Sequence, residues 1–149
     1  MEELRKFLKN WDENISFNFE NVIKIGREYF LVNKNVKEFM NKIKLDVFSA
    51  GIFLGEMKKK FIPSMALIEM ISTDNKIIVD DKTAWLFACG RDIFDTKDVK
   101  KEGNSKQVLV LNEKREVFGY AFKCKDRGKY IYKNDLDIGN YLRREKSKR

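Results

Sequence analysis

The sequence predicts an α+β protein with two small domains. The N-terminal α/β domain should combine helices with antiparallel strands, and the C-terminal domain should be a small, mostly β, barrel-like unit. Apolar residues recur at helical spacing three times in the first half, whereas the second half holds several short strands and one early helix. Charge separates the halves as well. Residues 1–75 carry 12 Lys and Arg against 11 Asp and Glu, and residues 76–149 carry 19 against 12. We therefore expect domains at 1–75 and 76–149, with the excess positive charge on the second.

The first domain is expected to contain three helices, a hairpin and one further strand. Helices are predicted at residues 2–11 and 33–45 from the spacing of their apolar residues. A third helix is predicted to begin at Pro63 and Ser64, because Pro suits the first turn of a helix. Strands at 22–26 and 29–32 flank the turn at 26–28. Another strand is predicted at 47–57, before the turn at 58–60. In the second helix, Val36, Phe39, Met40 and Ile43 share one apolar face.

The second domain is expected to begin with a strand at 76–79 and a helix capped by Asp80 or Asp81. Gly90 should end that helix in a left-handed conformation, and Trp85 should lie in the core because it belongs to an apolar run. The polar stretch 95–106 is predicted to be a loop. Further strands are predicted at 108–111, 117–122 and 130–132.

A short terminal helix is predicted to follow, with Asp137 as its N-cap and an apolar face formed by Ile138, Tyr141 and Leu142. The last seven residues hold five cations and one acid: Arg143, Arg144, Lys146, Lys148 and Arg149 against Glu145. This run either is a solvated end that complements the helix dipole or holds positive charge at a fixed place on a surface. Charge alone favours the solvated end.

The composition indicates an anionic partner. The net charge is +8 and the pI about 9.4, which favours RNA, DNA or an acidic membrane surface without choosing among them. Hydrophobic residues make up 43% of the chain, enough for a core, but no apolar run is long enough to span a bilayer. We expect a cytoplasmic protein with reduced thiols at Cys89 and Cys124, although a pairing between them stays open.

The residue types argue against catalysis. The chain has no His, which excludes His-based triads, and its two Cys cannot complete a zinc site without His. Asp80 with Asp81, and Asp135 with Asp137, would suit Mg²⁺ or a carboxylate pair, but helix capping and turn hydrogen bonds explain them more simply. We expect no enzyme, no catalytic residue, no metal and no cofactor.

Four segments resemble the Nip-seven family of ribosome-biogenesis proteins, in its archaeal type. They are D-V-F-S-A-G-I-F-L-G-E-M at 46–57, K-I-I-V at 76–79 with W-L-F-A-C-G-R-D-I at 85–93, F-G-Y-A at 118–121, and D-I-G-N-Y-L-R-R-E at 137–145. The resemblance implies an N-terminal α/β domain followed by a PUA domain, an RNA-binding module. It also implies a role in rRNA processing and in maturation of the large ribosomal subunit, as a binding protein without a catalytic site.

With the resemblance added, the terminal cations are interpreted as RNA contacts. The predicted RNA-binding residues are Arg143, Arg144, Lys146, Lys148, Arg91, Lys97 and Lys100. Arg91 could instead complement a helix dipole, and Lys97 and Lys100 could belong to a solvated loop. The expected partners of this monomer are ribosomal RNA or its precursor and, through the N-terminal domain, other assembly proteins, without a membrane. The alternatives are a protein scaffold whose C-terminal charge serves solubility and, less well supported by the small first domain, an RNA-modifying enzyme.

Overall fold

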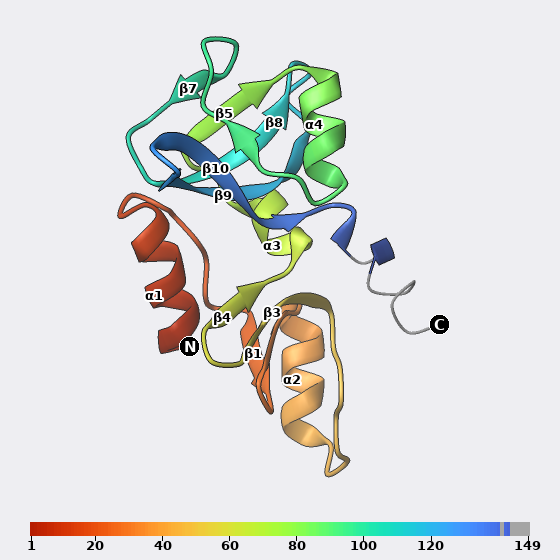
Figure 1. Ribbon diagram of the computed structural model, residues 1–149. Coiled ribbons are helices and arrows are strands. Elements are labelled where there is room, and N and C mark those ends of the chain that lie inside the picture. Colours follow the sequence, from red (N-terminus) through yellow and green to blue (C-terminus); the bar gives the residue numbers. More distant parts are fainter. Residues whose placement is uncertain (141, 144–149) are drawn as a thin grey trace. The chain divides into compact units, whose positions relative to one another are not determined.

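The chain divides into two units, Met1–Ser72 and Thr73–Arg149, and each unit has a sheet of its own (Figure 1). The structure, a computed structural model, describes residues 1–140, 142 and 143. The fold is the α+β class that the sequence predicts, with helices and an antiparallel sheet first and a curled, barrel-like sheet second. The division falls slightly before the expected boundary at residue 75.

The first unit is built on a four-stranded antiparallel sheet in the order β1-β2-β3-β4. Its elements are α1 (Glu2–Trp11), β1 (Val22–Ile25), β2 (Glu28–Leu31), α2 (Lys34–Lys42), β3 (Ile52–Met57), β4 (Phe61–Pro63) and α3 (Met65–Met70). Leu4, Leu8 and Trp11 lie on one face of α1 and are buried, as their helical spacing predicts.

Two local predictions for this unit need correction. Pro63 is the last residue of β4 rather than the first of a helix, and Ser64 caps α3 by accepting the Leu67 N–H at 3.1 Å. The helix after Asn33 exists, but α2 buries none of its residues, and Phe39 is 62% exposed. The apolar face expected on this helix is therefore not part of the core.

The second unit is a six-stranded sheet in the order β6-β10-β9-β8-β5-β7, in which β5 and β8 form the one parallel pair (Figure 1). Its elements are β5 (Lys76–Val79), α4 (Asp81–Ala88), β6 (Ile93–Phe94), β7 (Lys100–Glu102), β8 (Gln107–Asn112), β9 (Val117–Asp126) and β10 (Lys129–Asp137). Ile77, Phe87, Val110 and Tyr132 belong to its buried core.

The helix of this unit has the expected ends but not the expected inner face. Asp80 caps α4 by accepting the Thr83 N–H at 2.7 Å, and Gly90 has a φ of +92°. Trp85, however, is 63% exposed, so its predicted place in the core is wrong. Ala84 and Phe87 point inward instead, and Trp85 follows Ala84 by about 100° around the helix axis.

The strands β6 and β7 were not predicted, and β7 lies within the expected loop at 95–106.

Among the helices of the described chain, none combines the length and the apolar character needed to cross a membrane.

A fragment of residues 73–149 is expected to unfold cooperatively on its own. Asn75 holds the start of β5 in place through three hydrogen bonds. Its side-chain Oδ1 accepts hydrogen bonds from the backbone N–H groups of Asn104 and Ser105, at 3.0 Å each. Its backbone oxygen accepts a hydrogen bond from the Leu109 N–H at 3.0 Å. A fragment of residues 76–149 lacks these hydrogen bonds and should melt several degrees lower. Thermal unfolding by circular dichroism checks this, and a broad, non-cooperative melt of 73–149 would contradict independent folding.

Candidate nucleic-acid interface

The start of the cationic terminal run is fastened to the end of α4. The Arg143 guanidinium donates from Nη2 to Asp137 Oδ2 at 2.6 Å, and from Nη1 to Asp137 Oδ1 at 2.9 Å and to the Ala88 oxygen at 2.6 Å. Asp137 is 1% exposed, whereas the Arg143 side chain is 41% exposed. The hydrogen bonds to the Asp137 carboxylate, and its negative charge, raise the pKa of Arg143 above its ordinary value. The arrangement is a two-pronged ion pair that reaches back from the chain end to a helix.

Two glycines permit this close approach. A Cβ on Gly139 would lie 2.1 Å from the Ala88 oxygen, a distance that backbone atoms cannot accommodate without moving. A Cβ on Gly90 would lie 3.2 Å from Arg143 Cζ. We call Ala88, Gly90, Asp137, Gly139 and Arg143 the terminal clamp. Three residues of the motif at 137–145, Asp137, Gly139 and Arg143, therefore have a structural role.

The terminal segment differs from its prediction in two respects. Asp137 is the last residue of β10, although its Oδ1 does accept the N–H of Gly139 at 2.9 Å, as a capping carboxylate would. Ile138 and Leu142 are 41% and 68% exposed, so the apolar face predicted for this segment is not buried at these two residues.

The predicted RNA contact Arg143 has a structural partner in Asp137 and keeps part of its surface open. The other terminal contacts predicted from the sequence, Arg144, Lys146 and Lys148, lie outside the described residues, as does Tyr141.

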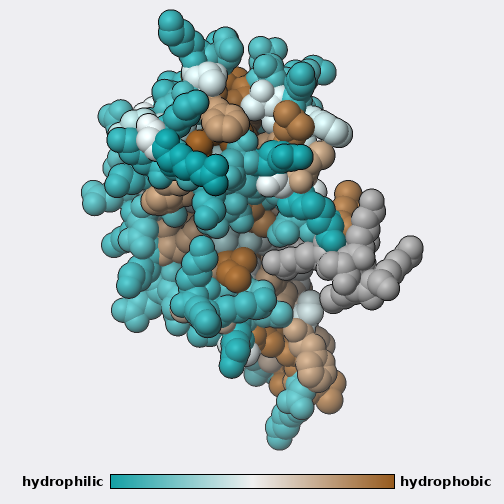
Figure 2. Space-filling model, in the orientation of Figure 1, coloured by the Kyte–Doolittle hydropathy of each residue, from teal (hydrophilic) through white to brown (hydrophobic). Residues whose placement is uncertain are grey.

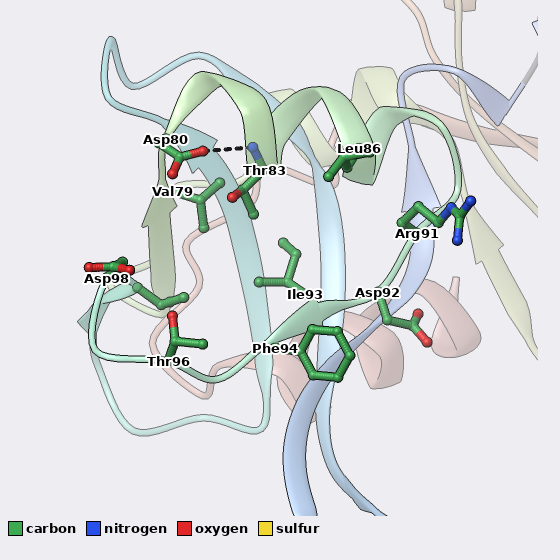
Figure 3. A pocket seen from close by; sticks show the side chains of 11 residues that line it. Val79, Asp80, Thr83, Leu86, Arg91, Asp92, Ile93, Phe94, Thr96 and Asp98 are labelled. Carbon is green, nitrogen blue, oxygen red and sulfur yellow. Dashed lines mark hydrogen bonds between the residues drawn. The ribbon is translucent and has the colours of Figure 1, made fainter.

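Arg91 follows the end of α4 and borders a cavity of about 690 Å³ (Figure 3). The cavity also exposes three carboxylates, from Asp80, Asp92 and Asp98, and apolar side chains that include Leu86 and Phe94. Figure 3 places Arg91 and Asp98 at opposite ends of the cavity. A phosphate inside the cavity would therefore meet more negative than positive charge.

Lys97 lies in the turn before β7 and Lys100 lies on β7 itself, and both are exposed. The neighbouring Lys101 instead forms an ion pair with Asp95. Its Nζ lies 2.5 Å from Asp95 Oδ1, and Lys123 Nζ lies 3.1 Å from Asp95 Oδ2. Burial raises the pKa of Asp95, but the two ammonium groups outweigh that effect and hold the pKa below its ordinary value. Arg91 directly follows Gly90, against which the Arg143 guanidinium lies, whereas Lys97 and Lys100 belong to β7 and the turn before it.

The sequence interpretation missed a basic cluster at the turn between β9 and β10. We call Lys123, Lys125, Arg127, Lys129 and Tyr130 the basic hairpin. Arg127 and Gly128 form its two-residue turn with φ values of +47° and +81°, as hairpin turns of this length require. The signal was present in K-C-K-D-R-G-K-Y, where cations alternate along a strand and continue across a turn.

The near-neutral charge of the first unit also conceals a local cluster. Five cations line a shallow pocket at its hairpin ends: Lys24, Arg27, Lys58, Lys59 and Lys60. Glu3 lies 3.7 Å from Lys24, and Glu56 lies 2.6 Å from Lys58, so two of these charges are compensated. Net charge over a domain therefore underestimates local charge.

Within the two acidic pairs of the sequence, Asp80, Asp135 and Asp137 have structural partners. Asp80 caps α4, Asp135 accepts a hydrogen bond from the Tyr120 hydroxyl, and Asp137 holds Arg143. Within residues 1–140, 142 and 143, no group of three His, Cys, Asp or Glu side chains is placed to hold a metal ion. Cys89 and Cys124 are both free thiols.

Comparisons with known families agree with the motifs. The family model described as the NIP7/UPF0113 pre-PUA domain matches residues 1–65, and the one described as the UPF0113 PUA domain matches residues 75–146. A comparison with curated proteins gave no match. These families are of RNA-binding type and are not known enzymes. The two matches stand in the order that the motifs predict and together cover most of the chain, and we conclude that the chain belongs to the Nip-seven (NIP7) family.

Proposed function

We propose that this protein is an RNA-binding factor of ribosome biogenesis that acts on ribosomal RNA or its precursor during maturation of the large subunit. Its family membership supports RNA binding and a general role in ribosome biogenesis. The observation that carries the proposal is the terminal clamp. By fixing Arg143 against the end of α4, it sets the place on the second unit at which the cationic run 143–149 begins.

In this proposal, RNA is held mainly through its phosphates. The contacting residues are Arg91, Lys97, Lys100, Arg143, Arg144, Lys146 and Lys148. Arg143 pairs with Asp137 while its side chain stays 41% exposed, and a guanidinium has five N–H donors, more than this pair uses. The carboxylates of the cavity beside Arg91 repel phosphates and so favour a path of the RNA backbone along the rim. Such contacts position RNA without reading its sequence.

Neutralising Arg144, Lys146 and Lys148 is expected to weaken RNA binding without affecting folding. Each phosphate contact releases counterions, so log affinity for single strands falls with log salt by about 0.7 per contact. The triple variant R144Q/K146Q/K148Q should therefore flatten the salt slope by roughly 2 if all three contacts are lost. Fluorescence anisotropy with a short single-stranded RNA at several salt concentrations measures both quantities.

The matched control is K34Q/K42Q/K44Q in the first unit, where the same charge is removed from exposed positions. This control should keep the affinity and the slope of the unchanged protein. Equal losses in the two triple variants would show a diffuse charge effect and would contradict contacts at the terminal run.

A second candidate function, docking of an assembly protein by the first unit, is favoured by an exposed apolar surface over α2 and the following loop (Figure 2). Phe39, Leu45, Phe48 and Ile52 are 62%, 77%, 84% and 43% exposed. Apolar surfaces of this kind mark protein contacts. The two functions are compatible, because they use different units.

The variant F39S/F48S is expected to lose association with ribosome-assembly proteins in pull-downs from its own cells, while its RNA affinity stays unchanged. Pull-down with quantitative mass spectrometry gives the first readout, and anisotropy gives the second. Unchanged recovery of assembly proteins would remove the basis for docking through this surface.

A further inference from the structure

Tyr130 is an exposed aromatic ring surrounded by cations. It lies on β10 directly opposite Lys125 of β9, and Lys123 lies two residues further along the same strand. The ring is 54% exposed, with Lys123 Nζ 5.2 Å and Lys125 Nζ 5.6 Å from its centroid. Ammonium groups at these distances are attracted by the face of an aromatic ring.

The neighbouring Tyr132 shows that this exposure is specific to one position. Lys123 also lies near the Tyr132 ring, at 5.7 Å, but Tyr132 is 2% exposed and belongs to the core. Burial, with a smaller effect of Asp95, raises the pKa of Tyr132 to about 12. Tyr132 is therefore a packing residue. Tyr130 extends beyond the core, at the end of the hairpin where an aromatic ring gains little from folding.

We propose that Tyr130 is a stacking platform for one unpaired RNA base, and that Lys123 and Lys125 hold the phosphates on either side of that base. The inference rests on the proposed RNA-binding function and adds to it the class of RNA, a single-stranded or looped segment. Aromatic rings stack on bases of any sequence, whereas the bases of a duplex are stacked on one another and hidden from the ring.

The charges around Tyr130 favour a phosphodiester chain. Four cations belong to the basic hairpin, and Lys101 approaches from β7. The acids nearby are Asp126, opposite Lys129, and Asp95, which is already paired with Lys101 and Lys123. Asp95 thereby fixes the Lys123 ammonium beside the ring. A nucleotide brought there finds a flat apolar surface and positive charge together, which is the combination that single-strand-binding proteins use.

The experiment measures binding of the full chain to short single-stranded oligoadenylate and to an RNA duplex of similar length, by anisotropy across several salt concentrations. Y130A should lower affinity for the single strand roughly tenfold, since stacking contributes about that much per base. Its salt slope should stay unchanged because no phosphate contact is lost. Y130F should bind like the unchanged protein. K125Q should flatten the slope by about 0.7.

The matched control is W85A, which removes an aromatic side chain exposed to a similar degree, 63%, on α4. It should keep the affinity of the unchanged protein. Crosslinking to RNA that contains 4-thiouridine, followed by mass spectrometry, should find the modified peptide at the basic hairpin, and this readout does not depend on the stability of any variant.

Four results would overturn the inference, the last together with the function on which it rests. Equal affinity of Y130A and the unchanged protein would show that Tyr130 is not a stacking platform. Crosslinks confined to segments other than the basic hairpin would show the same. Both results leave the proposed RNA-binding function intact. A loss for Y130A that is equally large on the duplex would show that the ring does not stack on an unpaired base. Failure of the unchanged protein to bind any RNA would overturn the proposed function itself.

Discussion

Replacing Arg143 by alanine is expected to lower the free energy of unfolding of the second unit by about 2 kcal/mol. Among the described residues, the substitution leaves the Asp137 carboxylate, 1% exposed, with the Gly139 N–H at 2.9 Å as its remaining donor, and it removes the donor at 2.6 Å from the Ala88 oxygen. A fully buried pair would cost more, but water can reach the place of the half-exposed arginine, which limits the loss. The melting temperature should fall by roughly 10 °C.

Lysine at the same position separates charge from geometry. R143K keeps the positive charge but cannot donate two parallel N–H groups to Asp137 and a third hydrogen bond to Ala88 at once. We expect R143K to lose most of the stability that R143A loses, and to lose less RNA affinity. Thermal unfolding and anisotropy on the same samples measure the two effects. A melting temperature of R143A within a degree of the unchanged protein would mean that the clamp contributes little to folding.

Alanine at Gly139 is expected to destabilise the second unit by about 1–3 kcal/mol, through overpacking rather than loss of a contact. Its Cβ would lie 2.1 Å from the Ala88 oxygen and 2.9 Å from Arg143 Nη1. Either the end of α4 or the terminal segment has to move, and the ion pair between Arg143 and Asp137 is then strained. Because the terminal cations begin at this point, we expect RNA affinity to fall as well, although no charge changes.

The substitution N140A, at the next residue, serves as the control. It changes a side chain in the same segment without placing an atom against the Ala88 oxygen. Differential scanning calorimetry compares the two variants. Similar melting temperatures for G139A and N140A would show that the segment adapts freely and that the glycine is not required for the close approach.

Local signals in the sequence predicted much of the fold. Asp80 and Gly90 mark the two ends of a helix through a side-chain cap and a left-handed backbone, and each does so in the structure. These features depend on a few adjacent residues, and the sequence displays them directly. The edge strands β6 and β7 have two and three residues, too few to show an alternating apolar pattern. Each pairs with a strand that is distant in the sequence, β6 with β10 and β7 with β5, so no local signal predicts them.

The candidate site was less predictable, because its contacts are distant in sequence. Arg143 pairs with Asp137, six residues away, but it reaches Ala88 only because β10 ends beside the C-terminus of α4. Trp85 belongs to an apolar run that a one-sided helix cannot bury completely. The basic hairpin shows the opposite case, since its alternating cations and its turn were visible in the sequence and could have been identified.

The most direct test of the central claim is crosslinking of the protein to RNA in its own cells, followed by sequencing of the attached tags. If the protein acts in maturation of the large subunit, tags should concentrate at defined places in large-subunit ribosomal RNA or its precursor. The R144Q/K146Q/K148Q variant should yield fewer of them at the same protein level. Tags spread across transcripts in proportion to their abundance, or no enrichment above an uncrosslinked sample, would contradict the proposed function.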